Sequence, residues 1–230
     1  MPLVSHILCR RSFVALAGGA LALLAALAFA ACGGDGETGD AAATEPVTAL
    51  DPDAYWGVQV LPPIPKPGFV LTDTEGNDFD LVADTEGSVT LLYLGYTNCP
   101  DICPTHMLDI KRALADLPED VRADIKVVFV TTDPARDTPQ VMRRWLDAFD
   151  PSFIGLTGDQ ETIDALQRSV GIIPATTTDL GGGNYAVNHA AYVMAFTPDN
   201  LAHLVYPYGI EREAWTHDLE KLVREGWTES

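Results

Sequence analysis

The sequence predicts a single α/β domain in which helices flank a central mixed sheet and an extra β-hairpin precedes the first core strand. Three observations support this fold class: a strand–helix–strand pattern over residues 91–130, two strands joined by a tight turn at residues 197–200, and an amphipathic segment near the C-terminus. The chain has 230 residues, of which 47% are hydrophobic. It is therefore long and apolar enough to bury one core of this size.

Residues 1–31 have the features of an export signal. Arg10 and Arg11 resemble a twin-arginine motif and precede an alanine-rich apolar run. The run ends at Cys32 in a setting that resembles a bacterial lipobox, whose cysteine is lipidated, although Phe29 replaces the usual leucine. An uncleaved membrane anchor is the alternative. Both interpretations tether the domain to the outer, extracytoplasmic face of a bacterial cytoplasmic membrane.

Residues 32–60 are expected to form a flexible acidic linker, because most of this stretch is rich in Gly, Ala, Asp, Glu and Thr and lacks apolar periodicity. The folded domain is predicted to span residues 61–230. The whole chain carries a formal net charge of −19, which argues against nucleic acid as a partner and against binding to anionic lipid surfaces. An acidic surface of this kind usually serves solubility.

The first part of the domain alternates turn signals with short apolar strands. The proline-rich segment 61–67 is stiff, and two short apolar runs flank a turn around Gly76, which predicts a hairpin. The core strand covers residues 91–96, and the apolar residues after it recur at helical spacing up to Leu117. Residues 125–130 form a second core strand. Strand, helix and strand in this order imply a parallel pair with a right-handed crossover.

The second part of the domain adds further helices and a second hairpin. Thr138 and Pro139 begin a helix that runs to about Phe149, with Thr138 as its N-cap. The remaining predicted elements are a helix at 160–170, a glycine-rich loop at 181–184, edge strands at 191–196 and 201–206, and a helix at 211–225. This order of elements, with a dithiol at the first core helix, is the thioredoxin arrangement.

That dithiol stands where the core strand passes into the helix. Cys99 and Cys103 are four positions apart, so their sulfurs come close enough to bind a soft metal together or to form a disulfide. Backbone N–H groups at a helix start favour the thiolate, which is the nucleophilic and metal-binding form. A structural disulfide or two buried thiols are the plainer alternative, but a bridge across so short a loop would stabilise the fold little.

A histidine is predicted to lie beside the dithiol. A thioredoxin fold presents a proline to its cysteines directly before a late strand, and Pro174 does not qualify because polar residues follow it. The position before the strand at 191–196 is held by Asn188, His189 and Ala190. His189 therefore replaces the proline. Two thiolates and one imidazole suit copper, because thiolates select Cu(I) and imidazole also accommodates Cu(II).

The chain resembles the Sco/SenC family of copper-handling, thioredoxin-like proteins over about residues 67–222. The motifs that carry the resemblance are Gly95–Pro104 (GYTNCPDICP), Asp133–Pro139 (DPARDTP), Ile154–Gly158 (IGLTG) and Val187–His189 (VNH). The resemblance implies that Cys99, Cys103 and His189 are copper ligands. It also implies that the protein helps to mature the dinuclear copper centre of cytochrome c oxidase, by delivering copper, by reducing the cysteines of the target, or both.

The chain departs from the family pattern around two histidines. The family usually has Asp before the ligand histidine and Ser after it, where this chain has Asn188 and Ala190, and such neighbours tune the orientation and basicity of a ligand. His106 stands where the family commonly has threonine. It is either an auxiliary ligand or a solvent-facing side chain.

Two further groups of residues near the motifs have alternative interpretations. Asp133 and Asp137, which flank Arg136, either attract a cationic partner or form ion pairs that hold a turn near the site. Met107 and Met194 lie in apolar patterns, so they are expected in the core rather than as thioether ligands.

These observations favour a monomeric, membrane-anchored copper chaperone. Its expected partners are the copper-bearing subunit of cytochrome c oxidase and another periplasmic copper carrier or thiol reductant. The alternative is a thiol-disulfide oxidoreductase in which Cys99 attacks, Cys103 resolves and copper is incidental. A peroxidase-type thiol enzyme is a weaker hypothesis, because it needs one highly activated cysteine with its own surroundings.

Overall fold

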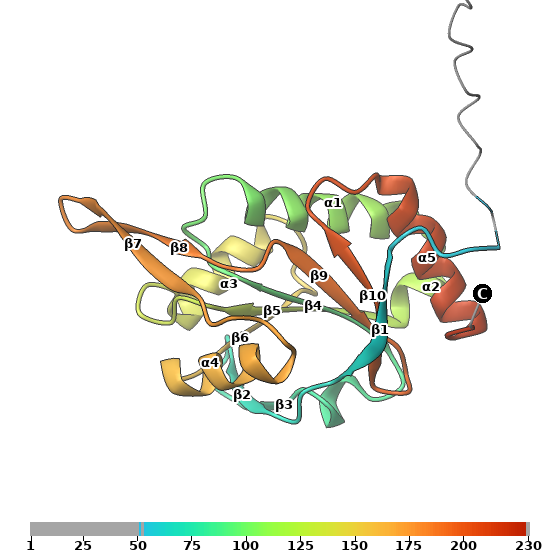
Figure 1. Ribbon diagram of the computed structural model, residues 1–230, viewed down its shortest axis with the longest axis horizontal. Helices are drawn as coiled ribbons and strands as arrows, with labels where there is room; N and C mark the ends of the chain where they lie inside the picture. Colours follow the sequence, from blue (N-terminus) through green and yellow to red (C-terminus); the bar gives the residue numbers. More distant parts are fainter. Residues whose placement is uncertain (1–50, 52, 229–230) are drawn as a thin grey trace, which may run out of the picture. The chain divides into compact units, whose positions relative to one another are not determined.

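The computed structural model describes residue 51 and residues 53–228. An eight-stranded mixed sheet lies at its centre, with the strand order β1-β10-β9-β4-β5-β6-β2-β3, and helices cover both faces (Figure 1). The strands of this sheet are β1 (Val58–Pro65), β2 (Val70–Asp73), β3 (Asp78–Asp80), β4 (Val89–Gly95), β5 (Ile125–Thr131), β6 (Ile154–Thr157), β9 (Tyr192–Phe196) and β10 (Leu201–Pro207). The α-helices are α1 (Ile102–Asp116), α2 (Glu119–Ala123), α3 (Pro139–Asp147), α4 (Gln160–Ser169) and α5 (Arg212–Glu225).

Strand β4 is buried along its whole length and organises the core. It pairs in parallel with β5 and antiparallel with β9. Because successive side chains of a strand point to opposite faces, Leu91 and Tyr93 pack toward α1, α3 and α5, whereas Leu92 and Leu94 pack toward α4. The predicted α/β fold class, with a thioredoxin-like mixed sheet and an additional β2–β3 hairpin, is confirmed.

The helix boundaries follow the signals in the sequence. Thr138 accepts a hydrogen bond from the backbone N–H of Val141 (3.3 Å) and Pro139 is the first helical residue, as predicted for α3. Asp159 caps α4 in the same way, accepting from the N–H of Thr162 (2.7 Å). Each of these helices therefore begins directly after a side chain that satisfies one of its free N–H groups.

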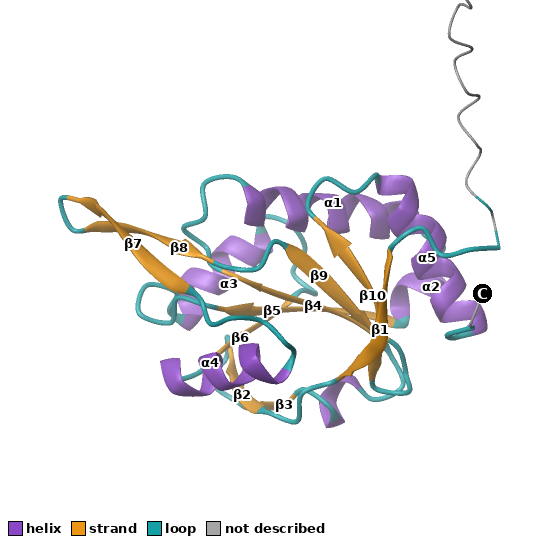
Figure 2. Ribbon diagram, in the orientation of Figure 1, coloured by secondary structure: helices purple, strands orange, loops and turns teal. Residues whose placement is uncertain are grey.

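The beginning of the domain differs from the prediction. The proline-rich segment is a strand, because β1 pairs antiparallel with β10 and forms the sheet edge outside the predicted edge hairpin (Figure 2). An edge strand needs donors on one side only, so it tolerates proline. The folded part also begins before residue 61, since Tyr55 is buried in the core and the N–H of Trp56 donates to Asp218 (2.9 Å). The last residues of the predicted 32–60 linker thus belong to the domain.

A second difference from the prediction is a two-stranded hairpin that is separate from the main sheet. It is formed by β7 (Thr176–Gly181) and β8 (Asn184–Asn188). In Figure 1 it projects from the body of the domain, and every residue of β7 is exposed. The polar residues after Pro174 were not expected to form a strand. They form one because they pair with β8 rather than with the main sheet.

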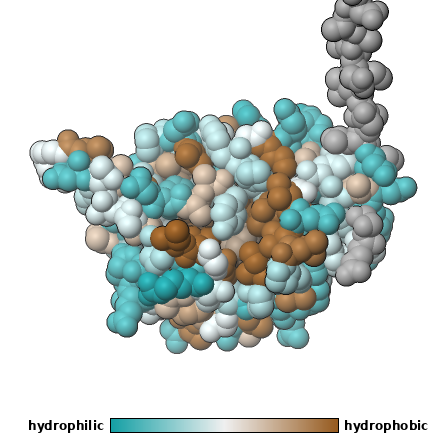
Figure 3. All heavy atoms as spheres, viewed as in Figure 1, coloured by the Kyte–Doolittle hydropathy of each residue, from teal (hydrophilic) through white to brown (hydrophobic). Residues whose placement is uncertain are grey.

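The predicted export signal, the lipidation site at Cys32 and residues 32–50 of the linker lie outside the described residues. Within residues 51 and 53–228, no helix combines the length and the apolar character needed to cross a membrane. Most of the described surface in the space-filling view is hydrophilic, and apolar residues gather in a band over β1 and β10 (Figure 3).

Candidate metal centre

The two cysteines lie where β4 leaves the sheet and α1 begins. Cys99 belongs to the connecting loop and is partly buried, whereas Cys103 lies in the first turn of α1 and is fully buried. The backbone N–H of Cys103 donates to Cys99 Sγ (3.3 Å), so the helix start is directed at the first sulfur. Gly95 makes room for the second, since a Cβ at this position would lie 2.9 Å from Cys103 Sγ. Both thiols are free.

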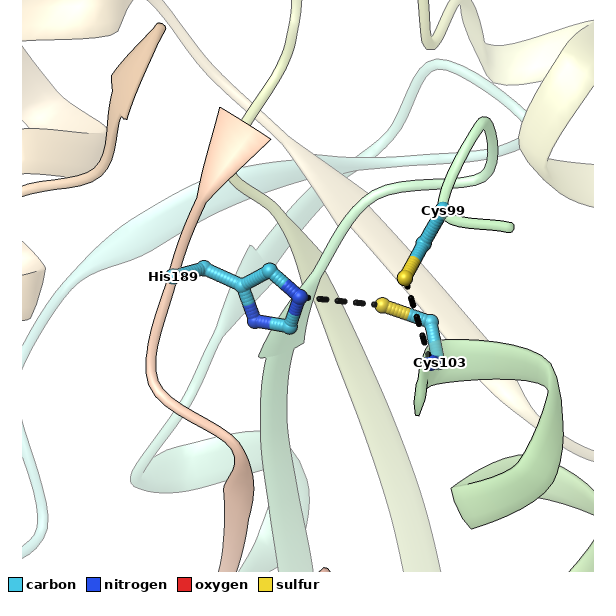
Figure 4. A group of neighbouring side chains, drawn as sticks. All are labelled: Cys99, Cys103 and His189. Carbon is cyan, nitrogen blue, oxygen red and sulfur yellow. Dashed lines mark hydrogen bonds between the residues drawn. The ribbon is translucent and has the colours of Figure 1, made fainter. Parts of the chain in front are cut away.

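His189 reaches the thiols from the loop that directly follows β8. Its Nε2 lies 3.3 Å from Cys103 Sγ, and Figure 4 shows the ring directed at the two sulfurs. Its Nδ1 lies 2.8 Å from the carbonyl oxygen of Ala190. Because a carbonyl only accepts, Nδ1 carries a proton, and in the neutral ring the lone pair of Nε2 is then directed toward the thiols. A backbone carbonyl therefore orients the imidazole in this chain, in which no Asp precedes it and no Ser follows it.

The three predicted ligands thus meet at one place. The ligand atoms of Cys99, Cys103 and His189 all lie within 4.8 Å of one another, and this is the only group of three or more His, Cys, Asp or Glu side chains with such a separation among the residues that the structure describes. A single soft cation can contact all three atoms. A site with two sulfurs and one imidazole nitrogen favours copper over hard cations such as Mg²⁺ or Ca²⁺.

The two sulfurs differ in their affinity for protons. The Cys103 thiol and the backbone N–H groups of Cys103 and Asp101 lower the pKa of Cys99 to about 4, against the opposing effect of partial burial. Burial raises the pKa of Cys103 far above its ordinary value, and the neighbouring Cys99 raises it further. At neutral pH the pair therefore holds one thiolate, at Cys99, and one thiol. A metal ion that binds both sulfurs must release the second proton.

Aromatic side chains line the inner wall of the site. The hydroxyl of Tyr93 donates to Cys103 Sγ (3.3 Å), and the rings of Tyr93 and Tyr96 stand edge-on to His189 with centroids 6.1 and 5.5 Å away. The sequence predicts Tyr93 only as part of the buried core strand at residues 91–96. An aromatic residue at the strand position that shares a face with the dithiol could have indicated this contact.

His106 is neither solvent-facing nor part of the three-donor group. Its side chain is 1% exposed, and neither ring nitrogen has a hydrogen-bond partner of ordinary geometry. The ring lies against the rings of Tyr93 and Tyr208, with centroids 4.9 and 5.6 Å away. Burial lowers the pKa of His106 to about 4, so the side chain is neutral at physiological pH. The expectation of an exposed side chain was wrong, because Tyr208 covers this turn of α1.

The Asp133–Pro139 motif holds a turn near the site, as one of the two interpretations predicts, through an ion pair at Asp133 and hydrogen bonds at Asp137. Asp137 is fully buried and accepts hydrogen bonds from the backbone N–H of Thr97 (2.9 Å), the Thr97 hydroxyl and the Thr131 hydroxyl (2.7 Å). Asp133 is paired with Arg136. Both carboxylates are therefore turned into the protein rather than toward an approaching cation. Thr97 precedes Cys99 by two residues, so the motif holds the thiol loop.

The expectation that Met107 and Met194 are core residues is confirmed, since both side chains are fully buried in the two core clusters. Access to the site is from the side of Cys99. A cleft of about 350 Å³ lies there, lined by residues of the thiol loop and of β8 that include Tyr96, Cys99 and His189. An incoming molecule in this cleft meets Cys99 and His189, while Cys103 lies behind them.

Comparisons with known proteins agree with this geometry. Residues 62–224 match the family model described as SCO1/SenC. The chain is 34% identical over 164 residues to a Stutzerimonas stutzeri protein named for copper binding, a match that covers 69% of this chain and 78% of the relative. It is 31% identical to the mitochondrial protein SCO1 homolog 1 of Arabidopsis thaliana, over 65% of this chain but only 47% of that protein.

A solved structure of a copper-bound protein has a fold similar to that of this chain. The structure of Bradyrhizobium japonicum ScoI with copper bound aligns with a TM-score of 0.62 and 31% sequence identity, covering 69% of this chain and 98% of that one.

Proposed function

The chain belongs to the SCO1/SenC family, and on this premise we propose that it binds copper through Cys99, Cys103 and His189 and supplies the ion to the copper-bearing subunit of cytochrome c oxidase. Members of the family act in cytochrome c oxidase assembly. The observation that carries the proposal is the convergence of two sulfurs and one imidazole nitrogen within 4.8 Å from segments that lie 86 residues apart in the chain.

Copper is the cargo of this site, and the donors fit it. Thiolates favour Cu(I), while an imidazole allows the same three atoms to hold Cu(II). Cys99 is already ionised at neutral pH, whereas Cys103 gives up its proton only when the ion binds, so acid favours release of the ion. The cleft beside Cys99 offers a path to the site, and a target that donates its own thiolates reaches the copper there.

The proposal includes an extracytoplasmic, membrane-anchored location. Support comes from the sequence alone: Arg10 and Arg11 before an apolar run, and Cys32 in a lipobox-like setting. The stretch from Gly33 to residue 53 would span roughly 25 Å on average as a flexible chain. That length would allow a tethered domain to turn toward a membrane-embedded partner.

The direct test is the copper stoichiometry of the reduced domain, with visible spectra recorded under Cu(I) and under Cu(II). We expect one tightly held copper per wild-type domain and a thiolate charge-transfer band with Cu(II). Cys99→Ala and Cys103→Ala should abolish tight binding, and His189→Ala should alter the spectrum and weaken binding. His217→Ala, at a histidine on α5 outside the three-donor group, is the control. Full copper retention in Cys99→Ala would contradict the proposal.

A second candidate function is a thiol-disulfide reductase that acts on the cysteines of the oxidase subunit. It is favoured by the low pKa of Cys99 beside a protonated Cys103. Cys99 would attack the target disulfide and displace one target thiolate, and Cys103 would then attack Cys99 and displace the second. The domain would end with a Cys99–Cys103 disulfide, having given two electrons to the target.

The reduction potential of the dithiol decides between the two functions. A potential too oxidising to reduce a disulfide between the copper-ligand cysteines of the target would exclude the reductase role and leave copper delivery. A peroxidase role predicts instead that His189→Ala leaves peroxide turnover largely intact.

A further inference from the structure

Arg136 contacts β8, the strand that directly precedes the candidate imidazole ligand His189. Its Nη1 donates to the carbonyl oxygen of Tyr185 (3.0 Å), and its guanidinium lies 3.6 Å from the centre of the Tyr185 ring. Its Nε pairs with one oxygen of Asp133, and the other oxygen of Asp133 accepts from the Tyr185 hydroxyl (2.8 Å). The Asp133–Pro139 loop thus contacts the backbone, the ring and the hydroxyl of Tyr185.

This attachment is important because β8 is weakly supported by the rest of the sheet. Tyr185 lies on β8, four residues before His189, and the described ladder of β8 is with the exposed strand β7. An isolated two-stranded hairpin is only marginally stable in water. Val187 anchors β8 in the core by apolar packing, and Arg136 supplies one of its polar anchors, beside the hydrogen bond from the Tyr185 hydroxyl to Asp133.

The same loop also holds the other half of the site. Asp137, the residue after Arg136, accepts from both the N–H and the hydroxyl of Thr97 in the thiol loop. Two neighbouring residues of one loop therefore contact both halves of the site. One of them holds the segment before Cys99 and the other holds the strand before His189.

We propose that Arg136 is a positioning residue for His189, which holds β8 against the Asp133–Pro139 loop so that the imidazole stays within reach of both sulfurs. This inference rests on the proposed copper site. Arg136 makes no bond to the ion and acts through Tyr185. Without it, β8 keeps its pairing to β7, and the domain offers copper two sulfurs and an imidazole that is no longer held in place.

The sign of the effect separates positioning from simple electrostatics. Arg136 is a cation near a site for a cation, so its charge opposes binding. Removing that charge and freeing Asp133 should tighten copper binding if electrostatics alone matter. Loss of positioning should weaken it, and the loss of groups that orient metal ligands typically costs about 10- to 100-fold in affinity.

The test measures Cu(I) affinity by competition with bathocuproine disulfonate on the reduced domain. Arg136→Ala is expected to weaken binding about tenfold or more, and Arg136→Lys should rescue it only in part, because lysine keeps the charge but lacks the planar fork. Arg143→Ala is the matched control. Arg143 also pairs with a nearby carboxylate, Asp147, and donates to a backbone carbonyl, that of Phe153 (2.9 Å), but it contacts no segment of the site.

A double-mutant cycle with His189→Ala tests whether Arg136 acts through the imidazole. In the His189→Ala background, Arg136→Ala should cause no further loss of affinity, because the imidazole that it positions is absent. Amide hydrogen exchange provides the readout of position: exchange in β8 should accelerate in Arg136→Ala while exchange in β4 and β5 stays unchanged.

The possible outcomes are distinguishable. Tighter or unchanged copper binding in Arg136→Ala, or an equal loss with and without His189, overturns the inference while leaving the copper site intact. An equal loss of affinity in Arg143→Ala overturns it as well. Absence of copper binding in the wild type contradicts the proposed function itself.

Discussion

Two fully buried carboxylates, Asp137 and Asp218, use the same physical device at different places in the molecule. Asp137 holds the loop before Cys99 through two hydrogen bonds from Thr97, and it accepts a third from Thr131 at the end of β5. Each carboxylate takes donors from a segment distant in the sequence and satisfies them inside the protein, where an unpaired donor would be costly.

Asp218, on α5, holds the beginning of the domain instead. It accepts from the backbone N–H groups of Trp56 and Gly57 (2.9 and 2.7 Å) and from the hydroxyl of Tyr206 (3.2 Å), and His217 Nδ1 lies 2.9 Å from it. Burial and hydrogen bonding alone therefore do not identify a functional residue. What distinguishes Asp137 is that one of its donor residues, Thr97, lies two positions before the candidate ligand Cys99.

The largest effect on stability is expected at Asp218. Asp218→Ala leaves several buried donors unpaired, so the free energy of unfolding should fall by about 3 kcal/mol, while the copper affinity of the folded domain should stay unchanged. Urea denaturation and chelator competition measure the two quantities. A copper affinity that falls together with stability would show that Asp218 also affects the copper site.

Asp137→Ala should cost less stability but more function. It removes a carboxylate with fewer partners, and we expect a loss of about 2 kcal/mol in the free energy of unfolding, together with a weakening of copper binding by about tenfold. The same two assays apply. Unchanged copper affinity would mean that the thiol loop does not need this anchor.

Removing one hydrogen-bond donor from each of the two buried carboxylates, Asp137 and Asp218, gives a matched pair of smaller changes. Thr97→Val and Tyr206→Phe each delete one hydroxyl that donates to a buried carboxylate, so each should cost about 1 kcal/mol in the free energy of unfolding. Only Thr97→Val should also change copper affinity or the Cu(II) charge-transfer band. Equal copper binding in both variants would show that the hydrogen bonds to Asp137 have no specific effect on the copper site.

The smallest expected effect is a pH dependence at Asp137. Burial raises the pKa of Asp137, so the folded protein binds this proton more tightly than the unfolded chain does. Its contribution to stability is thus greatest at low pH and is lost as pH rises through the folded-state pKa. The stability advantage of the wild type over Asp137→Asn should therefore be larger near pH 3 than near pH 7. An advantage that grows toward pH 7 in urea denaturation would contradict this assignment.

The core of the fold was predictable because its signals are local. Strand β4 is apolar throughout, and the start of α3 is marked by Thr138 and Pro139, so neither element depends on distant contacts for its identity. The meeting of His189 with the dithiol was predictable for a different reason. The order of strands and helices limits which late segment can lie beside the end of β4.

The missed features depend on tertiary contacts that leave no local pattern. β7 is polar and exposed, so it lacks the apolar alternation that marks a half-buried strand. β1 is interrupted by prolines and becomes a strand only because β10 offers its edge. The burial of His106 depends on Tyr208, a residue about one hundred positions later, and the attachment of β8 depends on Arg136.

The two edges of the main sheet have a consequence for the behaviour of the protein at high concentration. An exposed strand edge with a long row of free N–H and C=O groups is a template for pairing with another chain. On one side the outermost strand, β1, contains Pro62, Pro63 and Pro65, which have no N–H to donate, and on the other β3 is three residues long. Neither edge offers a continuous ladder, so the main sheet is protected against edge-to-edge aggregation while the site at its centre stays open.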